Sequence, residues 1–114
     1  MTIRSRAPQD RRNTSRVIAL HKCRFTCREA VHDAVIVDLS RNGALLSSEF
    51  LPANGEEIRM SVRSEHLDKE LNLLGKVLRG TMVTTDHGKR GRFVVRFADP
   101  PLGILQLIMK LNPS

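Results

Sequence analysis

The stretch VIVDLSRNGALL, residues 35–46, leads from one apolar segment to another through a short polar connection. Its first part is rich in Val and Ile, which favour strands, and residues 44–48 are expected to form a short strand that returns from the connection. Asn42 and Gly43 lie between the two, and we expect a turn there because Asn and Gly accept positive φ angles at low cost. The stretch therefore predicts a β-hairpin, with a carboxylate (Asp38) and a hydroxyl (Ser40) at its turn end.

The rest of the chain repeats this strand pattern. Apolar and polar residues alternate over residues 21–28, 58–62 and 92–97, and residues 71–84 predict a longer strand with a bend or bulge near its two glycines. Residues 102–111 are apolar except for Gln106 and Lys110, which predicts a terminal helix packed on the rest. Six strands joined by turns fit a closed antiparallel barrel, because closure removes exposed edges. The predicted fold class is all-β.

The size of the chain limits it to one domain. At 114 residues it is long enough for one modest core and too short for two. Residues 1–10 are polar and basic without periodicity, so we expect a flexible N-terminal arm there and a single domain over residues 11–114. No apolar run approaches the roughly 18 residues that cross a bilayer, and the N-terminus lacks the apolar segment of a secretory signal. We therefore expect a cytoplasmic protein.

The net positive charge comes from one end of the chain. Residues 1–28 hold eight arginines and lysines against one acidic residue, so they carry the whole net charge of +7. A charge this localised indicates an anionic partner that the N-terminal segment meets. A solvated tail that only aids solubility is the alternative.

The sequence shows no constellation typical of catalysis or of metal binding. Cys23 and Cys27 lie four residues apart on one strand face, too far apart for a disulfide and too few for a zinc site, so we expect two buried small hydrophobes. The four histidines pair with no carboxylate at a catalytic or metal spacing. We also find no nucleophile–base pair or phosphate loop of recognised spacing. We expect no catalytic residue, no metal, no cofactor and no enzymatic activity.

Two polar groups suit one ligand if the fold brings them together. Arg12 and Arg16 can clamp phosphates or guanine edges with forked donors and can stack on flat bases. Asp38 can accept from the N–H donors of guanine, Ser40 adds a small donor or acceptor, and Gly43 lets a ligand approach the backbone. Residues 38–43 alone are typical of a strand exit and turn. Together the two groups indicate a ligand that carries both a purine and a phosphate.

In these two groups the sequence resembles the PilZ domain family, whose members bind the bacterial second messenger cyclic di-GMP. The family signatures are Arg-x-x-x-Arg and Asp/Asn-x-Ser-x-x-Gly, and here they read RNTSR at residues 12–16 and DLSRNG at residues 38–43. The resemblance covers nearly the whole chain. It implies a six-stranded antiparallel barrel of the split-barrel type with a C-terminal α-helix.

The resemblance also implies a role for each motif residue. Arg12 and Arg16 would lie on a loop entering the first strand and grip the phosphates and guanines. Asp38 and Ser40 would hydrogen-bond the ligand at the end of the second strand, and Gly43 would make the turn.

Three further residues are secondary candidates. Arg11 is an extra basic residue before the first motif, and Asn42 occupies a position where many members have Gly. Arg96 lies near the end of the last strand, where Val94 replaces the usual glycine of the family.

The resulting hypothesis is a non-enzymatic bacterial receptor for cyclic di-GMP that acts in motility or biofilm regulation. It would relay binding to a protein partner by ordering of the arginine segment; the partner, in flagellar, polysaccharide or pilus machinery, is unidentified, and the chain could be a monomer or homodimer. One alternative is a small basic barrel that binds single-stranded nucleic acid. Such a barrel would have few stacking platforms, because the chain has no Trp or Tyr and three of its four phenylalanines, Phe25, Phe93 and Phe97, fall on predicted core faces. A protein-interaction adaptor without ligand binding is the other.

Overall fold

The computed structural model describes residues 16–65, 67, 69–86 and 88–111, with side chains from residue 21 to residue 110 of these ranges. The expected arm at residues 1–10, together with Arg11 and Arg12, lies outside the described residues. Arg16 was expected on the loop before the first strand, but it is the first residue of that strand, because its backbone pairs with Ser40; its side chain is not described.

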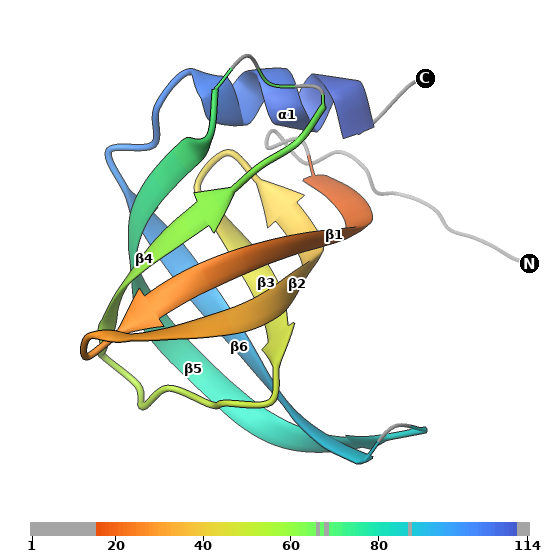
Figure 1. Ribbon diagram of the computed structural model, residues 1–114, viewed down its shortest axis with the longest axis vertical. Helices are drawn as coiled ribbons and strands as arrows, with labels where there is room; N and C mark the ends of the chain where they lie inside the picture. The colour runs from red at the N-terminus through yellow and green to blue at the C-terminus, as the bar shows by residue number, and fades with distance from the viewer. Residues whose placement is uncertain (1–15, 66, 68, 87, 112–114) are drawn as a thin grey trace, which may run out of the picture.

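Six antiparallel strands close into one barrel, and a single described helix lies across one end of it (Figure 1). The strands follow one another around the barrel in the order β1-β2-β3-β6-β5-β4. The elements are β1 (Arg16–Cys27), β2 (Ala30–Ser40), β3 (Gly43–Ser48), β4 (Glu57–Val62), β5 (Leu71–Thr85), β6 (Gly88–Ala98) and α1 (Gly103–Leu111). The predicted all-β barrel with a terminal helix is confirmed.

Inward-facing residues of every strand form one apolar core. Phe25, Phe93 and Phe97 are all buried, as their places in the alternating segments predict. Cys23 and Cys27 are buried free thiols, which confirms that they serve as small core residues. Helix α1 extends the core over the barrel end with its buried residues Ile104, Leu107 and Ile108.

The turn between β1 and β2 is tight and carries two charged residues. Arg28 and Glu29 have positive φ angles of 51° and 69°, the backbone geometry that favours glycine and asparagine. The Arg28 guanidinium is held by Glu56: its Nε donates to the Glu56 carboxylate at 3.0 Å, and Nη2 donates to the same oxygen. The Cys27 thiol also contacts this carboxylate, at 3.7 Å. Glu56 therefore fixes the hairpin to the loop before β4.

A bulge in β5 changes which residues face outward. The register of β5 against β6 shifts between Val77 and Arg79, so Leu78 is the extra residue. Beyond the bulge Arg79 pairs with Val94, and both lie on the outer side of the barrel wall. The expected irregularity is confirmed, and it falls between the two glycines of this strand.

Strand β1 is paired unevenly along its length. Its pairing with β2 extends from Arg16 to Cys27, with an irregularity between Ile18 and His21. Its pairing with β4, which closes the barrel, is confined to residues 24–26 within the described part of the chain. We call this short ladder the β1–β4 seam.

The described part of the chain contains no helix that is both long enough and apolar enough to span a membrane.

Candidate functional site

A groove of about 890 Å³ crosses the outer surface of β2, β3, β6 and β5. All predicted site residues with described side chains line it: Asp38, Ser40, Asn42, Gly43 and Arg96. They come from three strands and one turn, and the pairing of β3 with both β2 and β6 brings them together. Arg11 and Arg12 lie outside the described residues, and the groove is described without the Arg16 side chain.

The floor of the groove follows one row of paired residues across four strands. Asp38 of β2 pairs with Leu45 of β3, Leu45 with Val94 of β6, and Val94 with Arg79 of β5. Side chains paired across strands lie on the same face of the sheet. The row therefore begins at a carboxylate, crosses two apolar side chains and ends at a guanidinium.

Ser40 lies at the end of β2, where the predicted ligand site and the hairpin turn coincide. Its hydroxyl donates to the carbonyl oxygen of Gly43 at 3.2 Å and so closes the turn. The hydroxyl oxygen retains lone pairs that can accept a hydrogen bond from a ligand. Arg16 is the register partner of Ser40, which places the second arginine of the first motif beside the second motif.

The turn after β2 differs from its expected geometry. Positive φ angles among the described residues occur at other positions, and neither Asn42 nor Gly43 adopts one. The expectation that this turn depends on a left-handed backbone is therefore wrong. A side-chain carbon on Gly43 would meet the carbonyl oxygen of Val95, so Gly43 is required by the close approach of β6. The backbone N–H of Phe97 also donates to the carbonyl oxygen of Asn42, at 2.8 Å.

Two arginines in the groove are not among the predicted site residues. Arg79 and Arg92 line it together with Arg96, and all three are exposed. Alternation along β6 places Arg92, Val94 and Arg96 on one face, and this signal was present in the sequence. No such signal was present in the sequence for Arg79, because its position depends on the bulge at Leu78.

The charge of the groove is positive. Its described charged side chains are three arginines and one aspartate, Asp38. The three arginines form no ion pair with another described residue, in contrast to Arg28 with Glu56 and Arg24 with Asp33. Unpaired guanidiniums around an apolar floor favour an anionic ligand with a flat apolar part. Within the described residues no group of three or more His, Cys, Asp or Glu side chains could hold a metal ion.

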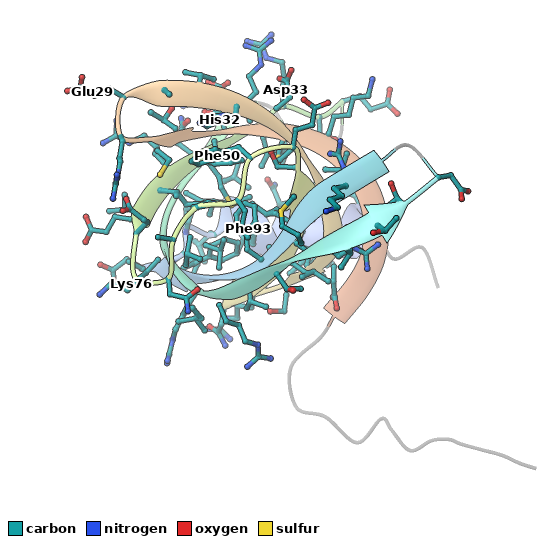
Figure 2. All side chains as sticks on the ribbon, turned by 90° about the horizontal axis from the view of Figure 1, so that it is seen from below. Glu29, His32, Asp33, Phe50, Lys76 and Phe93 are labelled. Carbon is teal, nitrogen blue, oxygen red and sulfur yellow. The ribbon has the colours of Figure 1, made fainter. Side chains whose placement is uncertain are left out.

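The one exposed phenylalanine lies outside the groove. Phe50 is 39% exposed, whereas the other three phenylalanines are buried. Its ring stacks on His32 with centroids 4.2 Å apart, and Figure 2 shows the two rings side by side. They line a second hollow of about 700 Å³, which shares no lining residue with the groove. The ring already has a stacking partner, so it offers little as a platform for nucleic-acid bases.

The chain is similar to a known family and to several solved structures. The family model of the PilZ domain matches residues 10–111. The PilZ domain of Escherichia coli YcgR, solved with c-di-GMP, has a TM-score of 0.70 at 14% identity, covering 91% of this chain and 93% of that one. The Bacillus subtilis inhibitor of motility MotI/DgrA has a TM-score of 0.68 at 14% identity, covering 91% of this chain. Borreliella burgdorferi PlzA in complex with c-di-GMP has a TM-score of 0.57 at 16% identity, covering 84% of this chain.

The chain spans 51% of the MotI/DgrA chain and 45% of the PlzA chain. At these identities the solved structures show a shared fold. The search among curated proteins returned no match.

Proposed function

Because the chain belongs to the PilZ domain family, whose model matches residues 10–111, we propose that it is a receptor for cyclic di-GMP and not an enzyme. Two structures of the same fold, the YcgR domain and PlzA, were solved with c-di-GMP, and this supports the proposal. The observation that carries it is the groove, which places Asp38, Ser40 and Gly43 of the second motif beside unpaired arginines.

Each motif residue has a proposed role that follows from its chemistry. Asp38 accepts hydrogen bonds from the N–H groups on the pairing edge of a guanine. Ser40 accepts one further hydrogen bond through the lone pairs that its bond to Gly43 leaves available. Arg12 and Arg16, with Arg11 in support, bind phosphates and stack on guanine. The apolar floor at Leu45 and Val94 receives a flat face of the ligand.

The proposed output is a changed surface. Binding of the dinucleotide fixes the segment that carries Arg12 and Arg16 across the groove, and a protein partner recognises the result. Such coupling requires that the ligand bind the closed arrangement more tightly than the open one. The partner would belong to flagellar, polysaccharide or pilus machinery.

Calorimetric titration with cyclic di-GMP tests the proposal directly. We expect the wild type to bind and to gain about 2.7 kcal/mol of stability at a ligand concentration a hundredfold above Kd. Arg16→Ala and Asp38→Ala should each lose at least tenfold in affinity, since each removes a charged hydrogen-bonding group. Arg59→Ala is the matched control, because Arg59 is an exposed arginine on β4 that does not line the groove. Absence of both heat and a shift in melting temperature for the wild type would overturn the proposal.

A random-sequence oligonucleotide, titrated in the same way, separates this function from binding of single-stranded nucleic acid. The burial of Phe25, Phe93 and Phe97 leaves Phe50 as the one exposed residue among the four phenylalanines. Since stacking on aromatic rings supplies much of the affinity for single strands, we expect weak binding that high salt abolishes.

A further inference from the structure

Arg79 and Arg92 form a second basic wall of the groove, on the side away from the Asp-x-Ser-x-x-Gly motif. We propose that these two residues bind the half of the dinucleotide that the two motifs leave uncovered. The inference rests on the proposed function and adds to it a pair of ligand-binding residues outside the motifs.

The spacing of the groove fits a ligand with two halves. Asp38 and Arg79 stand at opposite ends of one register row, separated by Leu45 and Val94. Three strand spacings separate their backbones by about 14 Å, because neighbouring strands lie about 4.8 Å apart. A single nucleotide held at Asp38 leaves part of that width empty. A cyclic dinucleotide, with two guanines and two phosphates, has groups to offer at both ends.

The bulge at Leu78 is what directs Arg79 to the groove. Without the extra residue, alternation from Val77, which is buried, would turn residue 79 inward. With it, Arg79 becomes the register partner of Val94 and lies on the outer face. The bulge thus interrupts β5 directly before the residue whose guanidinium lines the groove, Arg79.

Arg92 completes the wall from the neighbouring strand. It lies two residues before Val94 on β6, about 7 Å along the strand, and pairs with Thr81 of β5. Arg79 and Arg92 therefore reach the same end of the apolar floor from two directions. Neither has an ion-pair partner among the described residues, so both guanidiniums can turn to a ligand without breaking an internal bond.

The chemistry of the guanidinium group determines which ligand groups Arg79 and Arg92 can bind. Arginine donates two parallel hydrogen bonds to a phosphate or to the O6 and N7 edge of guanine, and its plane stacks on a base. All of these groups occur in the second half of cyclic di-GMP. The wall therefore recognises the same class of ligand as the motifs, at its other end.

The test is a titration of cyclic di-GMP into Arg79→Gln, Arg92→Gln, Arg79→Ala and the control Arg59→Ala, in buffer of physiological ionic strength. The glutamine variants keep most of the side-chain stem, so they preserve folding while they remove the charge. We expect Arg79→Gln and Arg92→Gln each to weaken binding about tenfold or more. Arg59→Ala should stay within twofold, although it removes the same charge. This contrast separates a direct contact from long-range attraction, which salt screens.

The outcomes are distinguishable from those for the proposed function. If the wild type binds and both glutamine variants bind equally well, the second wall is wrong and the receptor function stands. If Arg59→Ala loses as much as the groove variants, the effect is general electrostatics and the inference fails. If the wild type does not bind, the proposed function fails and the inference with it. Shifted NMR signals of the Arg79 and Arg92 Nε–H groups on addition of cyclic di-GMP would support the contact independently.

Discussion

The carbonyl oxygen of Val95 occupies the space that the first side-chain carbon of any residue other than glycine would need at position 43. Gly43 pairs with Arg96 at the point where β3 leaves the turn and joins β6. The glycine of the second motif is therefore a packing requirement of the barrel wall, and it fixes the strands on which the groove residues stand.

Gly43→Ala should destabilise the fold by about 1–3 kcal/mol, because a backbone atom cannot move aside as a side chain can. Chemical denaturation measures the loss. The control is Gly103→Ala at the start of α1, where the nearest atom is the flexible end of Leu71 at 3.0 Å and where alanine favours the helix. Equal stability of Gly43→Ala and wild type would contradict the close approach.

Glu29→Gly should stabilise the hairpin between β1 and β2. Glu29 is exposed and has a φ angle of 69°, a conformation that costs a side-chain-bearing residue about 1 kcal/mol. We expect a gain of about 0.5–1 kcal/mol in urea unfolding, offset in part by the greater freedom of glycine in the unfolded chain. Glu29→Ala retains the side-chain carbon and should change stability little. If both variants behaved alike, the strained backbone would not be the cause.

The Arg28–Glu56 pair should make the stability of the fold decrease at acidic pH. The hydrogen bond from Arg28 lowers the pKa of the Glu56 carboxyl from its ordinary value of 4.5. A lowered pKa in the folded state contributes stability that is present above the unfolded value and is lost as the pH falls through the folded one. The melting temperature of the wild type should therefore fall between about pH 5 and pH 3. Arg28→Ala should flatten this part of the curve, and Arg24→Ala, which removes the more open pair with Asp33 at 3.5 Å, should not.

Cys23 should be unreactive in the folded protein. Burial raises the pKa of its thiol to about 12, with a smaller contribution from the charge of Asp33. At pH 8 only about one molecule in 10⁴ would carry the reactive thiolate there. A thiol reagent followed by mass spectrometry should label Cys23 in urea and leave it unmodified in buffer. Rapid labelling of the folded chain at Cys23 would contradict the burial.

The same thiol should weaken the fold at alkaline pH. A pKa raised in the folded state contributes stability that is complete below the unfolded value, about 8.5, and is lost as the pH rises above it. Burial likewise raises the pKa of the Cys27 thiol, with the Glu56 carboxylate adding to the effect. We expect the melting temperature to decline between pH 8 and pH 10.

Much of the fold was predictable because apolar residues recur with period two. Phe25 and Phe93 occupy the core that their alternation predicts, and the apolar segment at residues 102–111 forms helix α1 over residues 103–111. Such patterns report which side of an element is buried, since burial is a property of each residue and its near neighbours. The second motif was predictable for a different reason, because Asp38, Ser40 and Gly43 are close in sequence and remain close in space.

The second wall of the groove could not be predicted in this way. Arg79 reaches the groove only because β5 gains one residue against β6, and registers of this kind are set by packing between distant strands. The reason for Gly43 was hidden likewise, because the atom that excludes a side chain belongs to Val95, far along the chain. Arg28 and Glu29 gave no sign of a left-handed turn, since neither residue type favours one.

The β1–β4 seam gives the barrel a place from which it can fray. Before residue 24, the described part of β1 has only β2 as a strand partner, and the Arg16–Ser40 pair lies at that end. Backbone amides in such half-held segments exchange with solvent through small local openings rather than through global unfolding. A ligand bound between Arg16 and Ser40 would bind only when this end of β1 is paired with β2, and it would stabilise that paired state. In that case two measurements would report the same opening equilibrium of β1. Occupancy of the groove would follow the paired state, and deuterium uptake at the start of β1 would follow the opened state.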